Sequence, residues 1–332
     1  MESSQYDIAI VGGGILGLST AMQLLERAPH WRVAVVEKEE ELATHQTGHN
    51  SGVMHSGIYY RPGSHKAQFC VAGLNNMVKF CEENEIEFQQ CGKVIVAIHE
   101  SELGRLQDLY ERGTANGVPD LEIVGPERLK EIEPHTAGVK ALYAPHTGIV
   151  NFIKVAEAFA AKFQQAGGDI FTGAAVRKIT RSGGTVTLET TKGNLQAKHL
   201  INCAGLYADK VASMTDEKVG IRIIPFRGEY YTLRPESHHL VSGLIYPVPN
   251  PEFPFLGVHF TRNIKGHVEA GPNAVMAMRR EGYRKRDFSL KDSLGNLGYP
   301  GFWKMAAKYW KIGMGEVWRS YNKGVFLRDL QT

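Results

Sequence analysis

A glycine-rich turn near the start of this 332-residue chain limits its possible folds more than any other feature. Residues 8–11 are apolar and predict a short strand, and Gly12, Gly14 and Gly17 follow in the pattern G-x-G-x-x-G. Apolar side chains then recur at helical spacing over residues 18–25. The order of strand, glycine turn and helix predicts the first half of a Rossmann-like βαβ unit.

The same unit predicts a dinucleotide site. A second strand over residues 33–36 ends in Glu37, twenty residues after Gly17. In this fold the first glycine allows the tight turn, the second lets the backbone approach a pyrophosphate, and the third lets the helix pack on the strand. The helix N-terminus stabilises phosphate charge, and Glu37 is placed to bond ribose hydroxyls, which disfavours the 2′-phosphate of NADP. NAD and FAD remain.

A later segment favours FAD over NAD. Residues 167–211 predict several short strands, then a closing strand over 199–203 that leads through Ala204 and Gly205 into a helix. This closing strand resembles the one that FAD-binding oxidoreductases place near the flavin nucleotide, after a strand (here near Val176) that passes the adenine. A plain NAD dehydrogenase has no reason to interrupt its sheet in this way. We therefore expect FAD as the cofactor.

The polar segment HQTGHNSGVMHSGIYYRPGS, residues 45–64, follows the second strand and is too rich in side-chain chemistry for a mere connection. We expect it to pass the pyrophosphate and to run beneath the flavin ring. Its small polar residues would then lie against the cofactor, and His55, Tyr59 and Tyr60 would line the space before the ring. The expected cofactor-binding residues are Gly12, Gly14, Gly17, Glu37, Lys38, Thr47, Gly48, Asn50, Ser51, Val176, Ala204 and Gly205.

At this point the sequence resembles a known family, the FAD-dependent L-2-hydroxyglutarate dehydrogenases and oxidases within the D-amino-acid-oxidase-like flavoenzymes. The resemblance spans most of residues 7–283 and rests on the blocks HQTGHNSGV, HSGIYYRPGS, QCGKVIVA, PHTGIVNF, INCAGLYAD, PFRGEYYTL, IYPVPN, FPFLGVHFT and GPNAVMAMRREGY. It implies oxidation of L-2-hydroxyglutarate to 2-oxoglutarate, with FAD as the hydride acceptor. It also implies a mitochondrial location in animals, electrons passed to a quinone or to oxygen, and membrane association in bacterial relatives; a cytoplasmic location is the alternative.

The expected reaction needs a base for the hydroxyl proton and cations for the substrate carboxylates. His55 is the first choice for the base, because an imidazole titrates near neutral pH and this one lies in the segment expected to face the flavin. His259 in FLGVHFT is the second choice. Arg227 in IIPFRGEYYTL is the first choice for a carboxylate, with Arg262, Arg279 and Arg280 as alternatives. Tyr59 and Tyr246 complete the expected catalytic set as pocket walls or hydrogen-bond donors.

The chain is long enough for two domains. We expect a discontinuous Rossmann-like FAD-binding domain over 1–80 and 146–210, entered through the helix FIKVAEAFAAKFQQ, which would end at Gly167. An antiparallel-sheet substrate domain would take 81–145 and 211–332. The expected class is thus α/β, with an α+β substrate lobe of the D-amino-acid-oxidase-like type.

Composition excludes several other classes of protein. A net charge of +3 is too small to indicate nucleic-acid binding, and the four cysteines show no metal-ligand spacing, so we expect no metal site. No apolar run is long enough to span a bilayer, and no presequence is seen.

The segment GFWKMAAKYWKIGMGEVWRSYNKG alternates aromatic and basic residues. We expect it to pack on the substrate domain, with an interfacial membrane helix as the alternative.

Two other interpretations of the chain stay open at this point. An amine oxidase of the sarcosine or glycine oxidase type would keep the fold and cofactor and change the substrate. A truncated form without catalysis is the other, because relatives in the family continue past the position of Thr332 with a segment that covers the flavin ring. In that case we expect weak FAD binding, restored by the full-length tail.

Overall fold

The computed structural model describes residues 5–215, 219–250 and 257–331. The chain forms two compact units. Unit 1 is built from Met1–Asn50, Phe152–Pro225 and Met278–Tyr299, and unit 2 from Ser51–Asn151, Phe226–Ala277 and Pro300–Thr332. These bounds differ from the expected domains chiefly in two places. Residues 51–80 join unit 2, and residues 278–299 return to unit 1.

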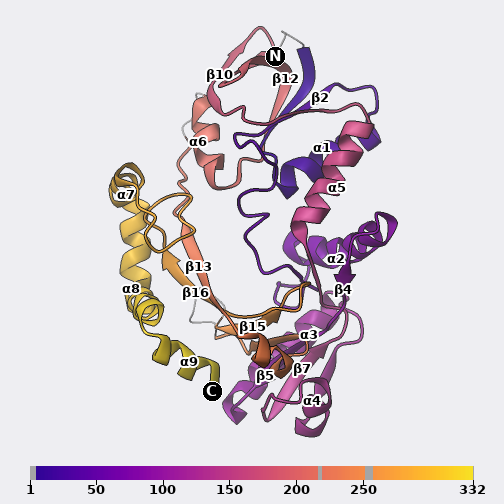
Figure 1. The fold of residues 1–332 in the computed structure, drawn as a ribbon, viewed down its shortest axis with the longest axis vertical. Coiled ribbons are helices and arrows are strands. Elements are labelled where there is room, and N and C mark those ends of the chain that lie inside the picture. Colours follow the sequence, from indigo (N-terminus) through magenta and orange to yellow (C-terminus); the bar gives the residue numbers. More distant parts are fainter. Residues whose placement is uncertain (1–4, 216–218, 251–256, 332) are drawn as a thin grey trace. The chain divides into compact units, whose positions relative to one another are not determined.

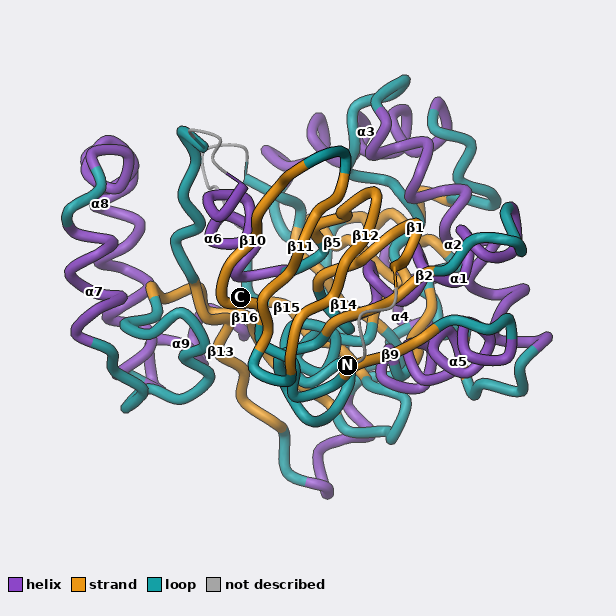
Figure 2. Tube along the Cα trace, turned by 90° about the horizontal axis from the view of Figure 1, so that it is seen from above, coloured by secondary structure: helices purple, strands orange, loops and turns teal. Residues whose placement is uncertain are grey.

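Unit 1 is a six-stranded sheet with helices packed against it, in the order β10-β11-β12-β1-β2-β9 (Figure 2). Strands β12, β1, β2 and β9 are parallel, whereas β10, β11 and β12 are antiparallel to one another in turn. The strands are β1 Gln5–Val11, β2 Val33–Val36, β9 Asp169–Phe171, β10 Val176–Ser182, β11 Thr185–Thr190 and β12 Gly193–Asn202. The helices are α1 Ile15–Arg27, α5 Phe152–Gln165, α6 Ala208–Ala212 and α7 Leu290–Leu297.

The predicted βαβ unit is present with the expected order. Helices α1 and α5 pack side by side (Figure 1), and α1 follows β1 through the glycine turn. All four residues of β2 are buried, as expected of a parallel strand covered on both faces. Helix α5 ends where the sequence indicates, because Gly167 adopts a φ of 88° and the Gly168 N–H donates to Phe163 O.

Unit 2 is built on a seven-stranded sheet in the order β13-β16-β15-β14-β5-β7-β6. Its strands are β5 Lys93–Ala97, β6 Glu122–Val124, β7 Lys140–Ala144, β13 Phe226–Thr232, β14 Leu244–Pro247, β15 His259–Arg262 and β16 Val268–Met276. A small three-stranded sheet contains β3 Val53–Met54, β4 Phe88–Gln89 and β8 Gly148–Val150. The helices are α2 His65–Glu83, α3 Leu103–Ala115, α4 Pro126–Ile132, α8 Pro300–Tyr321 and α9 Lys323–Gln331.

The larger sheet departs from the prediction at one pair of strands. Strands β5 and β14 are parallel, whereas the other neighbouring pairs are antiparallel, as expected. The two parallel strands are separated by a long stretch of chain, so no hairpin dictates their relative direction. The residues FPFL that precede His259 in the expected strand lie within 251–256, outside the described residues.

Pairing across the larger sheet places particular side chains on one face. Lys93 of β5 is paired with Leu244 of β14, and Leu244 with Thr261 of β15. Since paired residues share a face and alternate residues along a strand do too, Lys93, Tyr246 and His259 point to the same side. Tyr246 there packs into a core with Ile95, Ile58 and the partly buried Tyr59. The chain after β3 therefore covers the polar side chains of this face.

Helix α8 keeps an aromatic stripe in solvent. Trp303, Trp310, Trp318 and Tyr321 are all exposed, and Tyr321 has 77 % of its surface accessible. The buried residues of α8, Glu316 and Ser320, lie toward the sheet. Among the described residues, no helix has both the length and the apolar character needed to cross a membrane.

Candidate functional site

Unit 1 contains a pocket at the carboxyl end of β1, with a volume of about 1340 Å³. It runs from the glycine turn past Glu37 and Thr47 to Val176 and Gly205, so all its lining residues belong to unit 1. Pockets for drug-sized ligands usually measure about 300–1,000 Å³. This pocket therefore has room for a ligand of dinucleotide size, and it lies where open α/β sheets bind ligands.

The glycine turn of this pocket tolerates no side chain at two of its positions. A Cβ on Gly12 would lie 2.2 Å from Cys203 O, and a Cβ on Gly17 would lie 1.9 Å from Gly12 O. Gly12 also has a φ of 118°, which L residues rarely adopt. Helix α1 can therefore pack directly on β1 and β2, and its N-terminus faces the pocket.

Two side chains fix the loop that borders the pyrophosphate position. Glu37 is 9 % exposed and accepts hydrogen bonds from Gly13 N at 2.7 Å and from Glu39 N at 2.9 Å. Thr47 Oγ1 accepts from Ile15 N at 3.0 Å, on the first turn of α1. An ionised carboxylate has about four acceptor positions, so Glu37 retains capacity for ribose hydroxyls.

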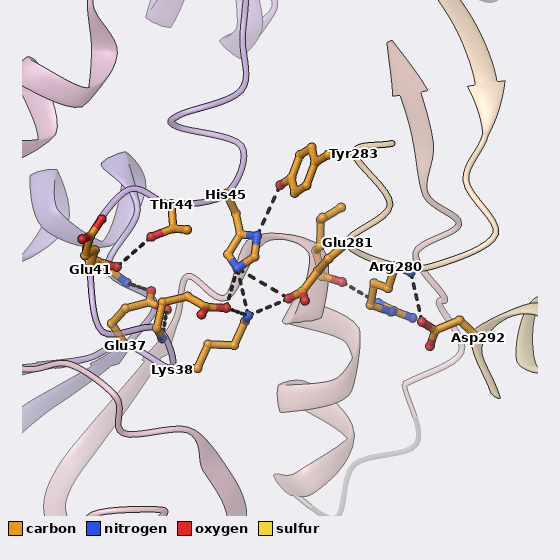
Figure 3. A network of polar contacts seen from close by, with 12 residues as sticks. Glu37, Lys38, Glu41, Thr44, His45, Arg280, Glu281, Tyr283 and Asp292 are labelled. Atoms are coloured by element: carbon orange, nitrogen blue, oxygen red, sulfur yellow. Dashed lines mark hydrogen bonds and ion pairs between the residues drawn. The ribbon is translucent and has the colours of Figure 1, made fainter. Parts of the chain in front are cut away.

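A polar network borders the same pocket (Figure 3) and joins residues 38–49 to residues 280–292. Lys38 Nζ lies 2.6 Å from Glu281 Oε1 and also pairs with Glu39, while His49 stacks on Tyr283 with ring centroids 3.9 Å apart. Buried Arg280 forms a two-pronged ion pair with Asp209 at 2.6 and 3.0 Å. The segment that returns to unit 1 is therefore anchored beside the pocket.

Part of this network has the spacing of a metal site. Ligand atoms of Glu39, His45 and Glu281 lie within 4.8 Å of one another. The Lys38 ammonium, however, already makes ion pairs with both carboxylates. A bound metal ion would have to displace this charge, so the geometry favours a salt-bridge network.

Unit 2 holds a second group of polar side chains, which we call the polar cluster: His55, Tyr59, Lys93, Tyr246 and His259. The Lys93 ammonium lies 4.6 Å from the ring centroid of Tyr59 and 5.3 Å from that of Tyr246. The rings of Tyr246 and His259 stack at 3.9 Å. His55 Nδ1 and the Tyr59 hydroxyl are buried without hydrogen-bond partners among the described residues. Such unpartnered buried groups are rare in proteins, which makes His55 and Tyr59 candidates for a ligand contact.

The two histidines of the polar cluster are neutral at pH 7. Burial, helped by the nearby charge of Lys93, lowers the pKa of His55 to about 3. Burial also lowers the pKa of His259 to about 4, although a hydrogen bond to Gly257 opposes this shift. Because His259 Nδ1 lies 2.9 Å from Gly257 O, Nδ1 must carry the proton. Nε2 is then left with a free lone pair, as a base requires.

The lowered pKa values of these histidines predict that the folded chain loses stability in acid. A histidine with a lowered pKa binds fewer protons in the folded state, so stability falls as pH drops below about 6.5. For His259, which is 5 % exposed, the shift from 6.5 to about 4 corresponds to about 2 kcal/mol lost between pH 7 and pH 5. We expect the melting temperature of His259→Gln to fall less over this interval than that of the wild-type chain. Equal falls in thermal melts at pH 7 and pH 5 would contradict the assignment.

Arg227, the first choice for a substrate carboxylate, already has a carboxylate partner. Its guanidinium lies 2.6 Å from Glu229 Oε1, and both side chains are largely buried. Ser320 of α8 donates to the other oxygen of Glu229 at 2.6 Å. Arg227 and Glu229 share a strand face, as their alternation indicates. The alternative Arg280 is buried against Asp209 in unit 1.

Comparison with known proteins places the chain in a family. Residues 7–313 match the family described as FAD dependent oxidoreductase. The chain belongs to this FAD dependent oxidoreductase family. It is 51 % identical to L-2-hydroxyglutarate dehydrogenase of Indibacter alkaliphilus, over 98 % of this chain and 82 % of that protein. It is 44 % identical to the mitochondrial L-2-hydroxyglutarate dehydrogenase of Homo sapiens, over 99 % of this chain and 74 % of that protein.

Solved structures of flavoenzymes share the fold of this FAD dependent oxidoreductase. L-alpha-glycerophosphate oxidase from Mycoplasma pneumoniae with FAD bound superposes with a TM-score of 0.77 at 24 % identity, over 91 % of this chain and 78 % of that one. Glycine oxidase from Geobacillus kaustophilus gives 0.69 at 21 % identity, over 90 % and 78 %. These confirm the expected D-amino-acid-oxidase-like fold and FAD as the cofactor. Relatives are both bacterial and mitochondrial, so they assign this oxidoreductase no single location.

The pocket of unit 1 fits the FAD that this family uses. Nine of the expected cofactor-binding residues line it: Gly12, Gly14, Glu37, Lys38, Thr47, Asn50, Val176, Ala204 and Gly205. The other three lie outside the lining. Gly17 has the predicted packing role, Ser51 belongs to unit 2, and a Cβ on Gly48 would meet Ala43 O at 2.8 Å.

Several residues of the pocket and of the polar cluster are not predicted by the sequence of this oxidoreductase. Arg177 and Lys210 line the pocket and add positive charge that suits a diphosphate. Arg279, expected above as an alternative for a substrate carboxylate, lines this pocket as well. In unit 2, Lys93 was not predicted, although the run KVIVA carries the signal: a lysine that begins an otherwise apolar strand. The structure brings Tyr59, Tyr246 and His259 together with Lys93, and the Lys93 charge also acts on His55.

Proposed function

We propose that this chain oxidises L-2-hydroxyglutarate to 2-oxoglutarate, with FAD held in the pocket of unit 1 and the substrate at the polar cluster of unit 2. The observation that carries the substrate is the agreement among relatives from distant organisms. Proteins of Indibacter alkaliphilus, Escherichia coli and Homo sapiens, at 51 %, 47 % and 44 % identity, are all named L-2-hydroxyglutarate dehydrogenase. Such identity over almost the whole chain supports a shared substrate.

The chemistry of the polar cluster supports the same reaction. Oxidation of a secondary alcohol removes a hydride from C2 and a proton from the hydroxyl group, which leaves a carbonyl. When bound, FAD supplies the acceptor for the hydride. His259 Nε2 takes the hydroxyl proton, since its Nδ1 proton is held by Gly257 O. A substrate carboxylate bound nearby raises the pKa of an imidazole, so substrate binding itself strengthens this base.

The pocket of unit 1 supports the proposed placement of FAD. The N-terminus of α1 and the bare glycine turn suit the pyrophosphate, and Glu37 suits the ribose. The polar network of Lys38, Glu281 and Tyr283 holds the segment 280–292 at the border of the pocket.

A substrate panel tests the proposal against an amine oxidase. We expect the purified chain, supplied with FAD and an artificial electron acceptor, to form 2-oxoglutarate from L-2-hydroxyglutarate. Sarcosine and glycine should give no turnover, because neither carries the second carboxylate or the hydroxyl group. Turnover of either amine in place of the hydroxy acid would show that the chain is an amine oxidase. Mass spectrometry of the product decides between them.

We propose further that the reduced flavin passes electrons to a quinone and that α8 brings the chain to the membrane. The exposed Trp303, Trp310 and Trp318 lie on one stripe of α8, and Lys304, Lys308 and Lys311 flank it. Aromatic residues beside lysines suit the interface of a lipid bilayer. Co-sedimentation with anionic vesicles tests this: Trp310→Ser should lower binding. Wild-type chain left in the supernatant would contradict it, and oxygen would then be the better candidate acceptor.

A further inference from the structure

The polar cluster contains a buried lysine that the fold itself does not explain. Lys93 is 1 % exposed and occupies an interior strand between β14 and β7. In the described part of unit 2 it is the one buried lysine or arginine. Lysine is almost never fully buried without a partner, because the ammonium loses its hydration.

No carboxylate among the described residues pairs with Lys93. The titratable groups that face it are Tyr59, Tyr246, His55, His259 and Cys70. Both histidines are neutral at pH 7, and burial raises the pKa of Tyr59, Tyr246 and Cys70, so these three are neutral as well. Attraction between the ammonium and two aromatic rings offsets only part of the lost hydration. The cluster therefore carries one positive charge with no negative counterpart.

The other candidate cations for a substrate carboxylate have different surroundings. Arg227 makes an ion pair with Glu229. Arg262 lies one residue after Thr261 and three after His259 along β15, so its side chain leaves the opposite face of the sheet. Lys93, by contrast, starts from the same face as His259 and Tyr246.

We propose that Lys93 is the carboxylate-binding residue of unit 2, where its ammonium makes an ion pair with an acid group of the substrate. The unpartnered Tyr59 hydroxyl donates to the same carboxylate, and the unpartnered His55 Nδ1 supplies a further contact. The assignment rests on the proposed function and extends it. It makes the site specific for hydroxy acids over uncharged alcohols, since only an anion neutralises the buried ammonium.

Proton binding at Lys93 gives the proposal a second consequence. Burial lowers the pKa of Lys93 to about 8. An anion binds only the protonated form, so its affinity should fall about tenfold per pH unit above pH 8. Arginine stays protonated throughout this range, so Lys93→Arg should remove the fall if the longer side chain fits.

Calorimetric titration of the FAD-loaded chain with glutarate tests this inference. Glutarate has two carboxylates and no hydroxyl group, so it reports binding without oxidation. We expect Lys93→Met to weaken glutarate binding at pH 7 by about tenfold to a hundredfold, the usual range for a charged hydrogen bond. The matched control Lys140→Met removes an exposed lysine of the same sheet, on β7, and should bind as the wild type does.

The outcomes separate this inference from the proposed function. Wild-type affinity in Lys93→Met, or no glutarate binding by the wild-type chain, would overturn the assignment. Thermal melts check that the variant folds, and if it does not, the pH profile of the wild-type chain decides: affinity that stays constant from pH 7 to pH 10 would also overturn it. Glutarate binding that depends on Lys93, without oxidation of L-2-hydroxyglutarate, would leave the anion site standing and remove the proposed substrate.

Discussion

Replacement of Gly14 by valine should weaken FAD binding by more than about a hundredfold, which corresponds to about 3 kcal/mol. Gly14 precedes α1 in an extended conformation that valine can adopt, with a φ of −84°. Its added Cβ would meet Thr47 Oγ1 at 3.2 Å, so the chain itself needs only a small adjustment. The further methyl groups would occupy the space through which the pyrophosphate approaches the backbone. Fluorescence titration of the apoprotein with FAD measures the effect.

The control for this variant is Gly220→Val, also in unit 1. A Cβ on Gly220 would meet no atom within 4 Å, so this change adds the same side chain at an open position. We expect the control to bind FAD as the wild type does. Circular dichroism should show that both variants are folded. Tight FAD binding by a folded Gly14→Val chain would mean that the glycine turn is not the pyrophosphate site.

The second large effect is expected at the proposed base. His259→Gln should slow reduction of the bound flavin by L-2-hydroxyglutarate by about 10²–10⁴-fold, the usual contribution of a general base. Glutamine keeps a polar side chain beside Gly257 O but has no nitrogen lone pair at the position of Nε2. Anaerobic stopped-flow absorbance at saturating substrate isolates this step from binding.

Two comparisons make the test of His259 specific. His267→Gln changes an exposed histidine just before β16 and should leave the rate unchanged. His55→Gln should weaken substrate binding more than it slows the reduction, because His55 Nδ1 is unpartnered within the cluster and is assigned a binding contact. Slow flavin reduction in His55→Gln, together with a normal rate in His259→Gln, would make His55 the base and His259 the binding contact. That is the order that the sequence alone favours.

The parts of the fold that the sequence predicted well are those governed by neighbours along the chain. The glycine turn, α1, β2 and the end of α5 each depend on spacing within about thirty residues, and side-chain size at the glycines leaves little choice. Nine of the expected cofactor contacts line the pocket for the same reason. Local pattern and local structure agree there.

The features that escaped prediction depend on contacts between distant segments. The parallel pairing of β5 with β14 joins strands about 150 residues apart, and only this pairing places Lys93 beside Tyr246. The Glu229 carboxylate is two residues from Arg227, yet the sequence does not show whether such neighbours pair or diverge. Likewise, residues 278–299 return to unit 1, where Arg280 makes a buried ion pair with Asp209, seventy-one residues earlier in the chain.

We propose that this chain holds FAD and uses it to oxidise L-2-hydroxyglutarate. The most direct test is the absorption spectrum of the purified chain with FAD, recorded without oxygen before and after the acid is added. We expect the flavin band to bleach with the L enantiomer and to stay unchanged with the D enantiomer. A flavin that is bound but stays oxidised with the L enantiomer would contradict the proposed substrate. A chain that binds no flavin would contradict the proposed FAD pocket.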